Sequence, residues 1–289
     1  MLSGEGDPNT LVGTFQVKLS PANGATAATT AVFGKVYDGE TPQTVVWEDP
    51  EIDGECTLTT PRVPFCSTPC GGSAACVEDN TCQPYPAARS VGAVSVSGLH
   101  AASASSFVMN PIVNSYQPPA GVTLAYPPFS EGELITFSAA GSYFAPFSLQ
   151  SQGVLPLTPA SGAINLRRGD PMELRWSAGA NPAATIHVKL DISHHGGTKG
   201  QIECDTSDSG SLTISAALVA KLIDLGVAGY PSVIVTRHVT GSTVVAAGRV
   251  DLEVASVLEQ SVSVEGLASC TSKADCAAGQ SCRSDLSCG

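Results

Sequence analysis

The protein has 289 residues, of which 26 are Asp or Glu and 14 are Lys or Arg, so its formal net charge at pH 7 is −12. A surface this acidic repels phosphate backbones and anionic lipid headgroups, which argues against nucleic acid as a partner. No run of about 18 apolar residues occurs, which excludes a transmembrane helix.

The chain begins with a Gly-, Asp- and Pro-rich stretch, residues 1–10, which predicts a short N-terminal tether. Short segments of alternating apolar and polar residues follow, separated by Gly, Pro and Asn. This pattern is typical of β-strands in a sandwich or barrel. It predicts a first β domain over residues 11–155, with a cysteine-rich insertion at about 56–86.

A Pro- and Gly-rich linker is predicted at 156–163, followed by a second β-sandwich over 164–266, where the alternation is clearest from Thr185 to Ser193. One helix is predicted between Ser215, which can cap it, and Gly226, which can end it in a left-handed conformation. We therefore expect an all-β fold: two antiparallel β-sandwich domains, Ig-like or jelly-roll-like, with small disulfide-stapled modules and one short helix.

Ten cysteines lie mainly in two clusters of similar spacing. The pattern C-x5-C-x5-C begins at Cys70 and again at Cys276, in the tail formed by residues 267–289. Because the tail has too few apolar residues for a core, cross-links must hold it. Dense cysteine usage indicates an oxidising compartment. We therefore expect an extracytoplasmic protein, secreted or anchored as an outer-envelope lipoprotein, whose leader has been replaced by Met1.

Each cluster of four cysteines allows three pairings, of which we favour the interlocked one because it is the most compact. Only the spacing Cys66-x3-Cys70 suits a zinc knuckle, so disulfides are favoured over metal. Cys56 and Cys204 are left over, either as a bridge between the two domains or as separate buried thiols. The favoured pairs are Cys66–Cys76, Cys70–Cys82, Cys270–Cys282 and Cys276–Cys288.

The tail sequence from Cys270 to Cys282 reads C-x4-D-C-x2-G-x2-C, with Asp275 and Gly279 at the fixed positions. It resembles the cysteine tags of secreted and lipid-anchored proteins of myxobacteria and their relatives, and residues 77–82 are similar. The resemblance covers less than a fifth of the chain. It implies an envelope or extracellular setting and no mechanism.

Histidines and an aspartate gather on one predicted strand and the turn after it. His187 and Asp191 are expected on the outward face of the strand, His194 and His195 begin the turn, and His238 lies on another strand. Imidazoles with a carboxylate form a ligand set for zinc or copper, so His187, Asp191, His194 and His195 are the candidate metal site. The alternative is a polar strand face that ends in a histidine-bearing turn.

We expect no cofactor, but two acidic segments make calcium the first alternative and zinc or copper the second. Residues 48–55 contain five carboxylates, and Asp205–Gly210 is a sparser acidic segment. Calcium prefers about six to eight oxygen ligands, and neither segment has the EF-hand spacing. Each segment is otherwise a solvated acidic loop.

Several aromatic residues fall in a Pro-rich part of the first domain. Exposed rings on stiff loops can stack on sugars or anchor a protein. We therefore take Tyr116, Tyr126, Phe129 and Tyr143 as candidate partner-binding residues. Packing of these rings in a core is the alternative.

No phosphate loop, dinucleotide fingerprint or nucleophile elbow occurs in the sequence. We therefore predict a non-enzymatic extracytoplasmic binding or structural protein that presents loops to a protein or polysaccharide at the cell surface. The alternatives are a calcium-braced carbohydrate-binding module, and a metal-binding protein or metalloenzyme that uses the 187–195 histidine segment. Exposed sheet edges also leave homo-oligomerisation open.

Overall fold

The fold is that of a computed structural model, which describes residues 6–24, 26–102, 104–158 and 163–289. The described chain consists mostly of β-strands, with one α-helix and one short 3-10 helix. The all-β prediction is therefore confirmed at the level of fold class.

The largest sheet has ten strands. They are β1 (Leu11–Ser20), β2 (Thr29–Val36), β3 (Val46–Asp53), β4 (Cys56–Arg62), β9 (Ser115–Tyr116), β12 (Ile164–Leu166), β14 (Thr185–Asp191), β15 (Gln201–Ser207), β17 (Ser232–Val245) and β18 (Gly248–Val264). Nine of them follow the order β3-β4-β15-β14-β17-β18-β1-β2-β9. The tenth, β12, also pairs with β18 and is not part of this linear order. Strands from both sides of the predicted linker share this sheet, so two separate sandwich domains are not established.

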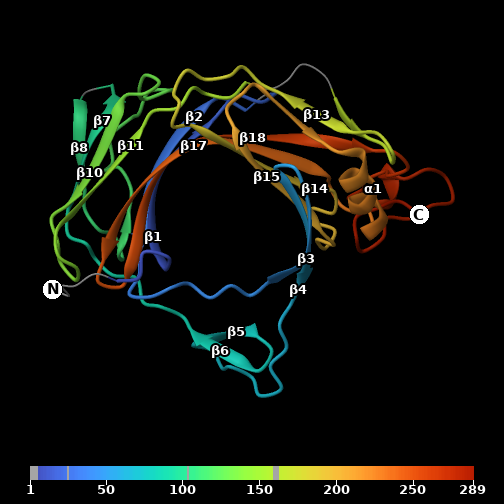
Figure 1. The fold of residues 1–289 in the computed structure, drawn as a ribbon, viewed down its shortest axis with the longest axis horizontal. Coiled ribbons are helices and arrows are strands. Elements are labelled where there is room, and N and C mark those ends of the chain that lie inside the picture. The colour runs from blue at the N-terminus through green and yellow to red at the C-terminus, as the bar shows by residue number, and fades with distance from the viewer. Residues whose placement is uncertain (1–5, 25, 103, 159–162) are drawn as a thin grey trace.

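The main sheet is curved, and further layers cover its convex side (Figure 1). A four-stranded sheet of order β11-β10-β7-β8 covers one end, and the strand pair β13-β16 lies with the helix over the other. These elements are β7 (Val94–Ala101), β8 (Ala104–Met109), β10 (Leu134–Ala139), β11 (Phe147–Gln152), β13 (Met172–Arg175), β16 (Ser211–Ile214) and α1 (Ala216–Leu225).

Side-chain alternation explains why only one side of the main sheet is covered. In β1, Phe15, Val17 and Leu19 are buried, whereas the residues between them are partly exposed. Successive side chains of a strand point to opposite faces, so the apolar set meets the covering layers. Two hydrophobic cores result, one under the four-stranded sheet and one under α1 and β13-β16.

Helix α1 begins where the sequence predicts, because the Ser215 hydroxyl accepts a hydrogen bond from the backbone N–H of Leu218. It ends at Gly226, whose φ is 116° and ψ is 146°. The expected left-handed cap is therefore wrong in detail. The chain leaves the helix in an extended direction at positive φ, a region that glycine adopts more readily than other residues.

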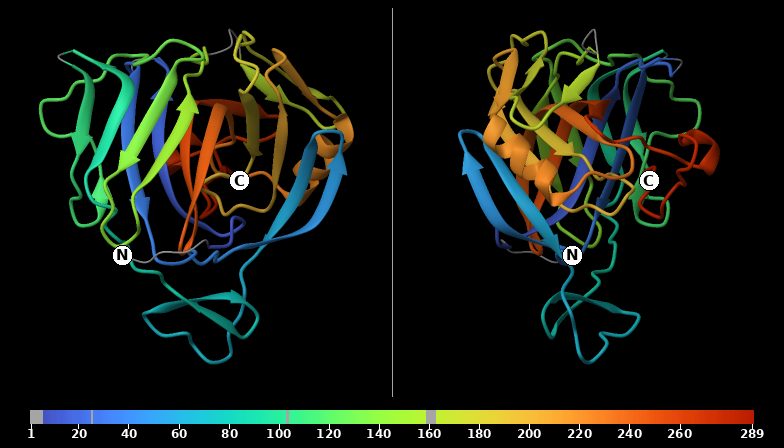
Figure 2. Two further views of the ribbon diagram at one scale, coloured as in Figure 1. Left: turned by 60° about the vertical axis from the view of Figure 1, so that its left-hand side comes forward. Right: turned by 90° about the vertical axis from the view of Figure 1, so that its right-hand side faces the viewer.

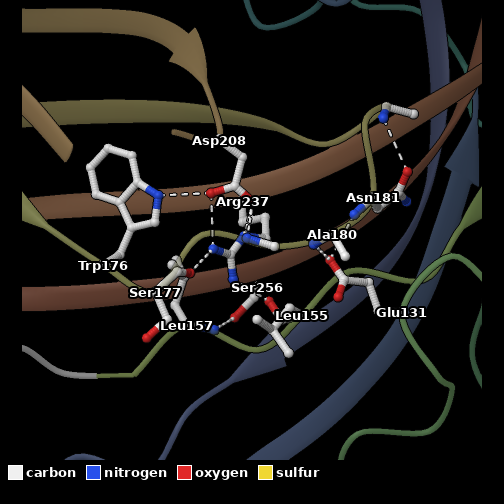
Figure 3. A network of polar contacts seen from close by, with 12 residues as sticks. Glu131, Leu155, Leu157, Trp176, Ser177, Ala180, Asn181, Asp208, Arg237 and Ser256 are labelled. Atoms are coloured by element: carbon white, nitrogen blue, oxygen red, sulfur yellow. Dashed lines mark hydrogen bonds and ion pairs between the residues drawn. The ribbon is translucent and has the colours of Figure 1, made fainter. Parts of the chain in front are cut away.

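A buried ion pair crosses the convex side between the two cores (Figure 3). Arg237 of β17 is 0% exposed, and its Nε lies 2.8 Å from Oδ2 of Asp208. Arg237 also donates to the backbone carbonyls of Leu155 and Ser177, and Trp176 donates to Asp208. Burial raises the pKa of Asp208, but the hydrogen bonds from Arg237, Gly179 and Trp176 and the Arg237 charge together lower it more, so the pKa lies below its usual range.

All ten cysteines form disulfides, in the pairs Cys56–Cys204, Cys66–Cys76, Cys70–Cys82, Cys270–Cys282 and Cys276–Cys288. The first joins directly opposed residues of β4 and β15. Five disulfides indicate an oxidising, extracytoplasmic environment. Across the described residues, we find no helix with the length and apolarity needed to span a membrane.

The two cysteine clusters form similar modules in different settings. The insertion, with β5 (Ala74–Glu78) and β6 (Thr81–Pro84), projects from the body (Figure 2). The tail packs against the body, where the backbone N–H of Gly229 donates to the carbonyl of Asp285. Each module contains a residue at positive φ next to paired backbone, Asn80 between β5 and β6 and Leu286 between the β-bridged Cys282 and Cys288.

The predicted tether and linker are only partly described. Residues 1–5 and 159–162 lie outside the described chain. Gly6 donates a backbone hydrogen bond to Val245, and Arg249 donates to the carbonyl of Pro8, so residues 6–10 lie against the β17–β18 hairpin. In the linker, Leu157 is buried and its N–H donates to Ser256.

Candidate functional site

The concave side of the main sheet presents polar side chains, and we call it the polar face. Its residues are those that alternate with the buried set. They include Thr14, Gln16, Lys18, Lys35, Thr185, His187, Lys189, Glu203, Asp205, Thr236, His238, Asp251 and Glu253. No layer of the described structure covers this face in Figure 1.

Across the middle of the polar face, side chains of neighbouring strands bind one another. His187 Nδ1 lies 2.8 Å from Asp205 Oδ1, and Gln16 Nε2 donates to Glu253 over 2.9 Å. Thr185 and His238 form a third cross-strand pair. These groups are paired with one another, whereas Lys18, Lys189 and Thr236 on the same face have no side-chain partner within the described chain.

A pocket of about 430 Å³ lies at the β9 edge of the polar face, between strands β1, β2 and β9 and the segment 37–43. This segment leaves β2 and leads toward β3 at the opposite edge of the sheet. Figure 1 shows it crossing the open side of the curve as a blue trace. The lining residues are Leu11, Val12, Gly13, Thr14, Phe33, Gly34, Lys35, Tyr37, Glu40, Thr41, Gln43, Ser115, Tyr116 and Gln117.

Tyr116 positions one wall of the pocket from within the core. The ring is 1% exposed, and its hydroxyl accepts from the N–H of Val91 and donates to the carbonyl of Gly92. Because neighbouring residues of β9 point to opposite faces, this anchor turns Ser115 toward the pocket. Tyr116 is buried where it lines the pocket, and its contact with a partner stays a prediction.

The strand β2 approaches Tyr116 and the Phe15 ring closely at Gly34. A Cβ atom at Gly34 would lie 2.2 Å from the Phe15 ring, so only glycine fits there without displacing it. Phe15 also packs on Tyr116, with 5.5 Å between ring centroids. The floor of the pocket therefore rests on close-packed aromatic rings.

The segment 37–43 is anchored at its start. The backbone N–H of Tyr37 donates to Val12, and the carboxylate of Asp38 binds Arg89 and the N–H of Ala87. Partial burial raises the pKa of Asp38, but the hydrogen bonds from Arg89 and Ala87 and the Arg89 charge lower it more, so the pKa lies below its usual range. The cysteine insertion adds a contact, because Gln83 donates to the carbonyl of Glu40.

The pocket gathers several polar side chains that have no protein partner in the described structure. Within the described part of the chain, Thr14, Glu40, Gln43, Ser115 and Gln117 make no side-chain hydrogen bond to another protein group. The pocket also contains an aromatic ring on a rigid strand, since Phe33 of β2 is 45% exposed. This end of the face therefore offers both apolar and hydrogen-bonding contacts to a ligand.

The predicted metal ligands converge only in part: His194 Nδ1 lies 4.0 Å from Asp191 Oδ2, whereas His187 has a different partner. His187 binds Asp205, whereas Asp191 is only 5% exposed and accepts hydrogen bonds from Ser193 and Thr198. The unbroken register of β14 keeps Asp191 in the same alternation as His187, but the strand ends there and the buried carboxylate caps the following turn. His194 and His195 lie in that turn with their rings 3.9 Å apart.

Close groups of potential metal ligands exist in the described chain only among the cysteines. Each group of three is built from cysteines that are joined in disulfides. In the acidic segment 48–55, Glu48 pairs with Arg62 and Glu51 pairs with Lys221. No arrangement of the described residues supports the calcium, zinc or copper predictions, which stay predictions.

The other predicted partner-binding rings lie wholly or partly in the first core. Phe129 is 4% exposed, and the partly buried Tyr126 packs against the same core. Tyr143 carries the Arg89 guanidinium over its ring at 4.5 Å. The core alternative therefore describes these rings better than exposed loops do.

Phe33 is the ring that sequence reasoning missed. The signal was present, because residues 29–36 alternate and place Phe33 opposite the buried Val32 and Val36. An exposed ring in such a strand is a better candidate for contact with a ligand than a ring in a Pro-rich loop.

Comparisons with known proteins add no family. No family model matches the chain, and no curated protein matches it in sequence. The function must therefore be argued from the geometry of the polar face.

Proposed function

We propose that this protein is a non-enzymatic, extracytoplasmic binding protein that holds its ligand in the pocket between β1, β2, β9 and segment 37–43. One observation carries the proposal: the pocket combines the exposed ring of Phe33 with polar side chains that have no partner in the described chain. Binding sites are typically concave and apolar, with a few oriented polar groups.

Rigidity supports a role in binding. The pocket walls belong to paired strands above close-packed rings, and segment 37–43 is held by the Asp38–Arg89 ion pair. A site that is ordered before binding loses little conformational freedom when the ligand arrives, so more of the contact energy appears as affinity.

The proposed setting is the cell surface. The five disulfides suit an exported protein, and the cysteine tags resemble those of secreted and lipid-anchored envelope proteins. We propose that the protein is secreted or held in the outer envelope, where its partner is a protein or a polysaccharide.

A substitution that fills the pocket tests this proposal. Ser115→Trp places a large side chain in the pocket from its β9 wall. Thr185→Trp is the matched control, because it adds the same ring to the polar face on β14, away from the pocket lining. Binding of each variant to the envelope fraction of the producing organism is measured by co-sedimentation and compared with the native protein.

We expect the native protein and Thr185→Trp to bind equally well and Ser115→Trp to lose binding. Circular dichroism and thermal melting verify that both variants fold. Equal binding by the two folded variants would overturn the pocket as the site. Failure of the native protein to bind any envelope fraction would overturn the binding function itself.

A further inference from the structure

We infer that the pocket binds an uncharged sugar unit of a polysaccharide, with the sugar ring stacked on Phe33. This inference rests on the proposed binding function and names its ligand class. It is carried by three properties of the pocket: the exposed ring, the type of its free polar groups and its balanced charge.

The ring of Phe33 provides an apolar platform. It lines the pocket from β2, and almost half of the residue is exposed. Burying an aromatic face against apolar ligand atoms is favourable, and a phenylalanine in a paired strand has little freedom to lose. The C–H face of a sugar ring is flat and apolar and matches such a platform.

The polar groups around the ring suit hydroxyls. Thr14 and Ser115 carry hydroxyl groups, and Gln43 and Gln117 carry amides. Hydroxyl and amide groups can both donate and accept hydrogen bonds, as sugar hydroxyls do. Because these groups have no partner in the described chain, a sugar can bind them without breaking protein hydrogen bonds.

Charge favours a neutral ligand over an acidic or a basic one. The pocket lining carries Lys35 and Glu40, whose charges cancel. The net charge of the whole chain is −12, which repels a polyanion approaching from solution. A protein partner that docks through charged side chains would meet no net charge of opposite sign in the pocket.

The size and the rim fit one part of a longer chain. The volume of about 430 Å³ lies within the usual range for small-molecule sites, about 300–1,000 Å³. Thr41, Gln43 and Gln117 on the rim are exposed, so a polymer can continue past the pocket.

The test measures the affinity of the full chain for soluble neutral polysaccharides by affinity electrophoresis. The neutral probes are dextran, starch, mannan, galactan and a mixed-linkage β-glucan. Polygalacturonate is the anionic arm, and unfolded casein is the polypeptide arm. The variants are Phe33→Ala, Phe33→Trp and, as a control for an exposed ring elsewhere, Phe65→Ala in the cysteine insertion.

We expect at least one neutral polysaccharide to bind. Phe33→Ala should weaken that binding at least tenfold, about 1.4 kcal/mol, because the stacking platform is lost. Phe33→Trp should retain it, and Phe65→Ala should leave it unchanged.

Several outcomes would overturn the inference. They are binding of polygalacturonate or casein alone, binding of no probe, and neutral-sugar binding that Phe33→Ala leaves intact. The pocket proposal fails separately. Suppose that Ser115→Trp abolishes envelope binding but that no neutral polysaccharide competes with the envelope for the native protein. The pocket is then a binding site, and its ligand is not a neutral sugar.

Discussion

The two faces of the ten-stranded sheet are formed by the same strands but carry different kinds of side chain. On the convex face, residues such as Phe15 and Leu252 are fully buried in the first core. Among the residues that the structure describes, Arg237 is the only charged one that reaches 0% exposure, and it is paired with Asp208. On the concave face, Gln16 and Glu253 of the same strands remain partly exposed. Strand alternation alone therefore gives one sheet a buried, stabilising face and a polar face that is open to a ligand. The predictions below change the convex face, the concave face or a segment outside the sheet, each in turn.

The largest effect is expected from breaking the buried ion pair. Arg237→Ala leaves the Asp208 carboxylate buried without its cation, which should lower the free energy of unfolding by about 3–5 kcal/mol. Asp205→Ala is the matched change on the concave face, because it removes the partner of His187 at a side chain that is 79% exposed. A surface pair is worth about 0–1 kcal/mol.

Urea unfolding of both variants measures the contrast between these two pairs. Similar losses for Arg237→Ala and Asp205→Ala would mean that the faces do not divide stability as described.

The next effect concerns the disulfide between β4 and β15. Cys56 and Cys204 are buried on the convex face and are separated by 148 residues in sequence. Replacing both by Ala should lower the free energy of unfolding by about 2–4 kcal/mol, because the unfolded chain is no longer cross-linked.

The control for this disulfide is the projecting cysteine insertion. Replacing Cys66 and Cys76 by Ala opens a loop with a sequence separation of only 10 in a module outside both cores. It should speed hydrogen exchange within the insertion and leave global unfolding nearly unchanged. Equal global losses from the two pairs would show that the insertion is part of the cooperative unit.

A smaller effect on stability is expected when acid protonates the carboxylate of Asp38. Its pKa is lowered in the folded state, so its contribution to stability is present above the unfolded value, about 3.9, and is lost as the pH falls through the lower folded value. Asp38→Asn should therefore be less stable than the native protein at pH 7, and the two should converge below about pH 4. Thermal melting at several pH values checks this, and a difference that stays constant with pH would rule out a role for the ionised carboxylate.

The smallest effect on stability is expected at Phe33. Its ring lies on the concave face, outside both cores. Phe33→Ala should change the free energy of unfolding by no more than about 0.5 kcal/mol, as surface substitutions usually do. A loss near that of a core phenylalanine, about 3–5 kcal/mol, would place the ring among the stabilising residues instead.

The sequence predicted the local features well. Strand alternation places Ile186, Val188 and Leu190 in the second core, and Ser215 caps the only α-helix of the described chain. The cysteine spacing led to the same interlocked pairs that the structure forms. These features depend on residues close together in the chain.

The features that were missed depend on contacts between distant segments. One sheet joins β1 and β2 to β14, β17 and β18, because the parallel pairing of β1 with β18 connects residues more than 200 positions apart. Tyr116 is buried because Val91 and Gly92 supply partners for its hydroxyl, which no local pattern reveals. Asp191 is buried because the strand ends at that residue and the turn behind it supplies donors.

Recognition on the concave face is tested most directly by hydrogen exchange of the native protein, measured with and without the envelope polymer that it binds. If the ligand binds in the pocket, exchange slows in segment 37–43 and around Ser115 and Gln117 and does not change in α1, β13 or β16. Protection centred on α1 or β13, with segment 37–43 unaffected, would contradict recognition on the concave face.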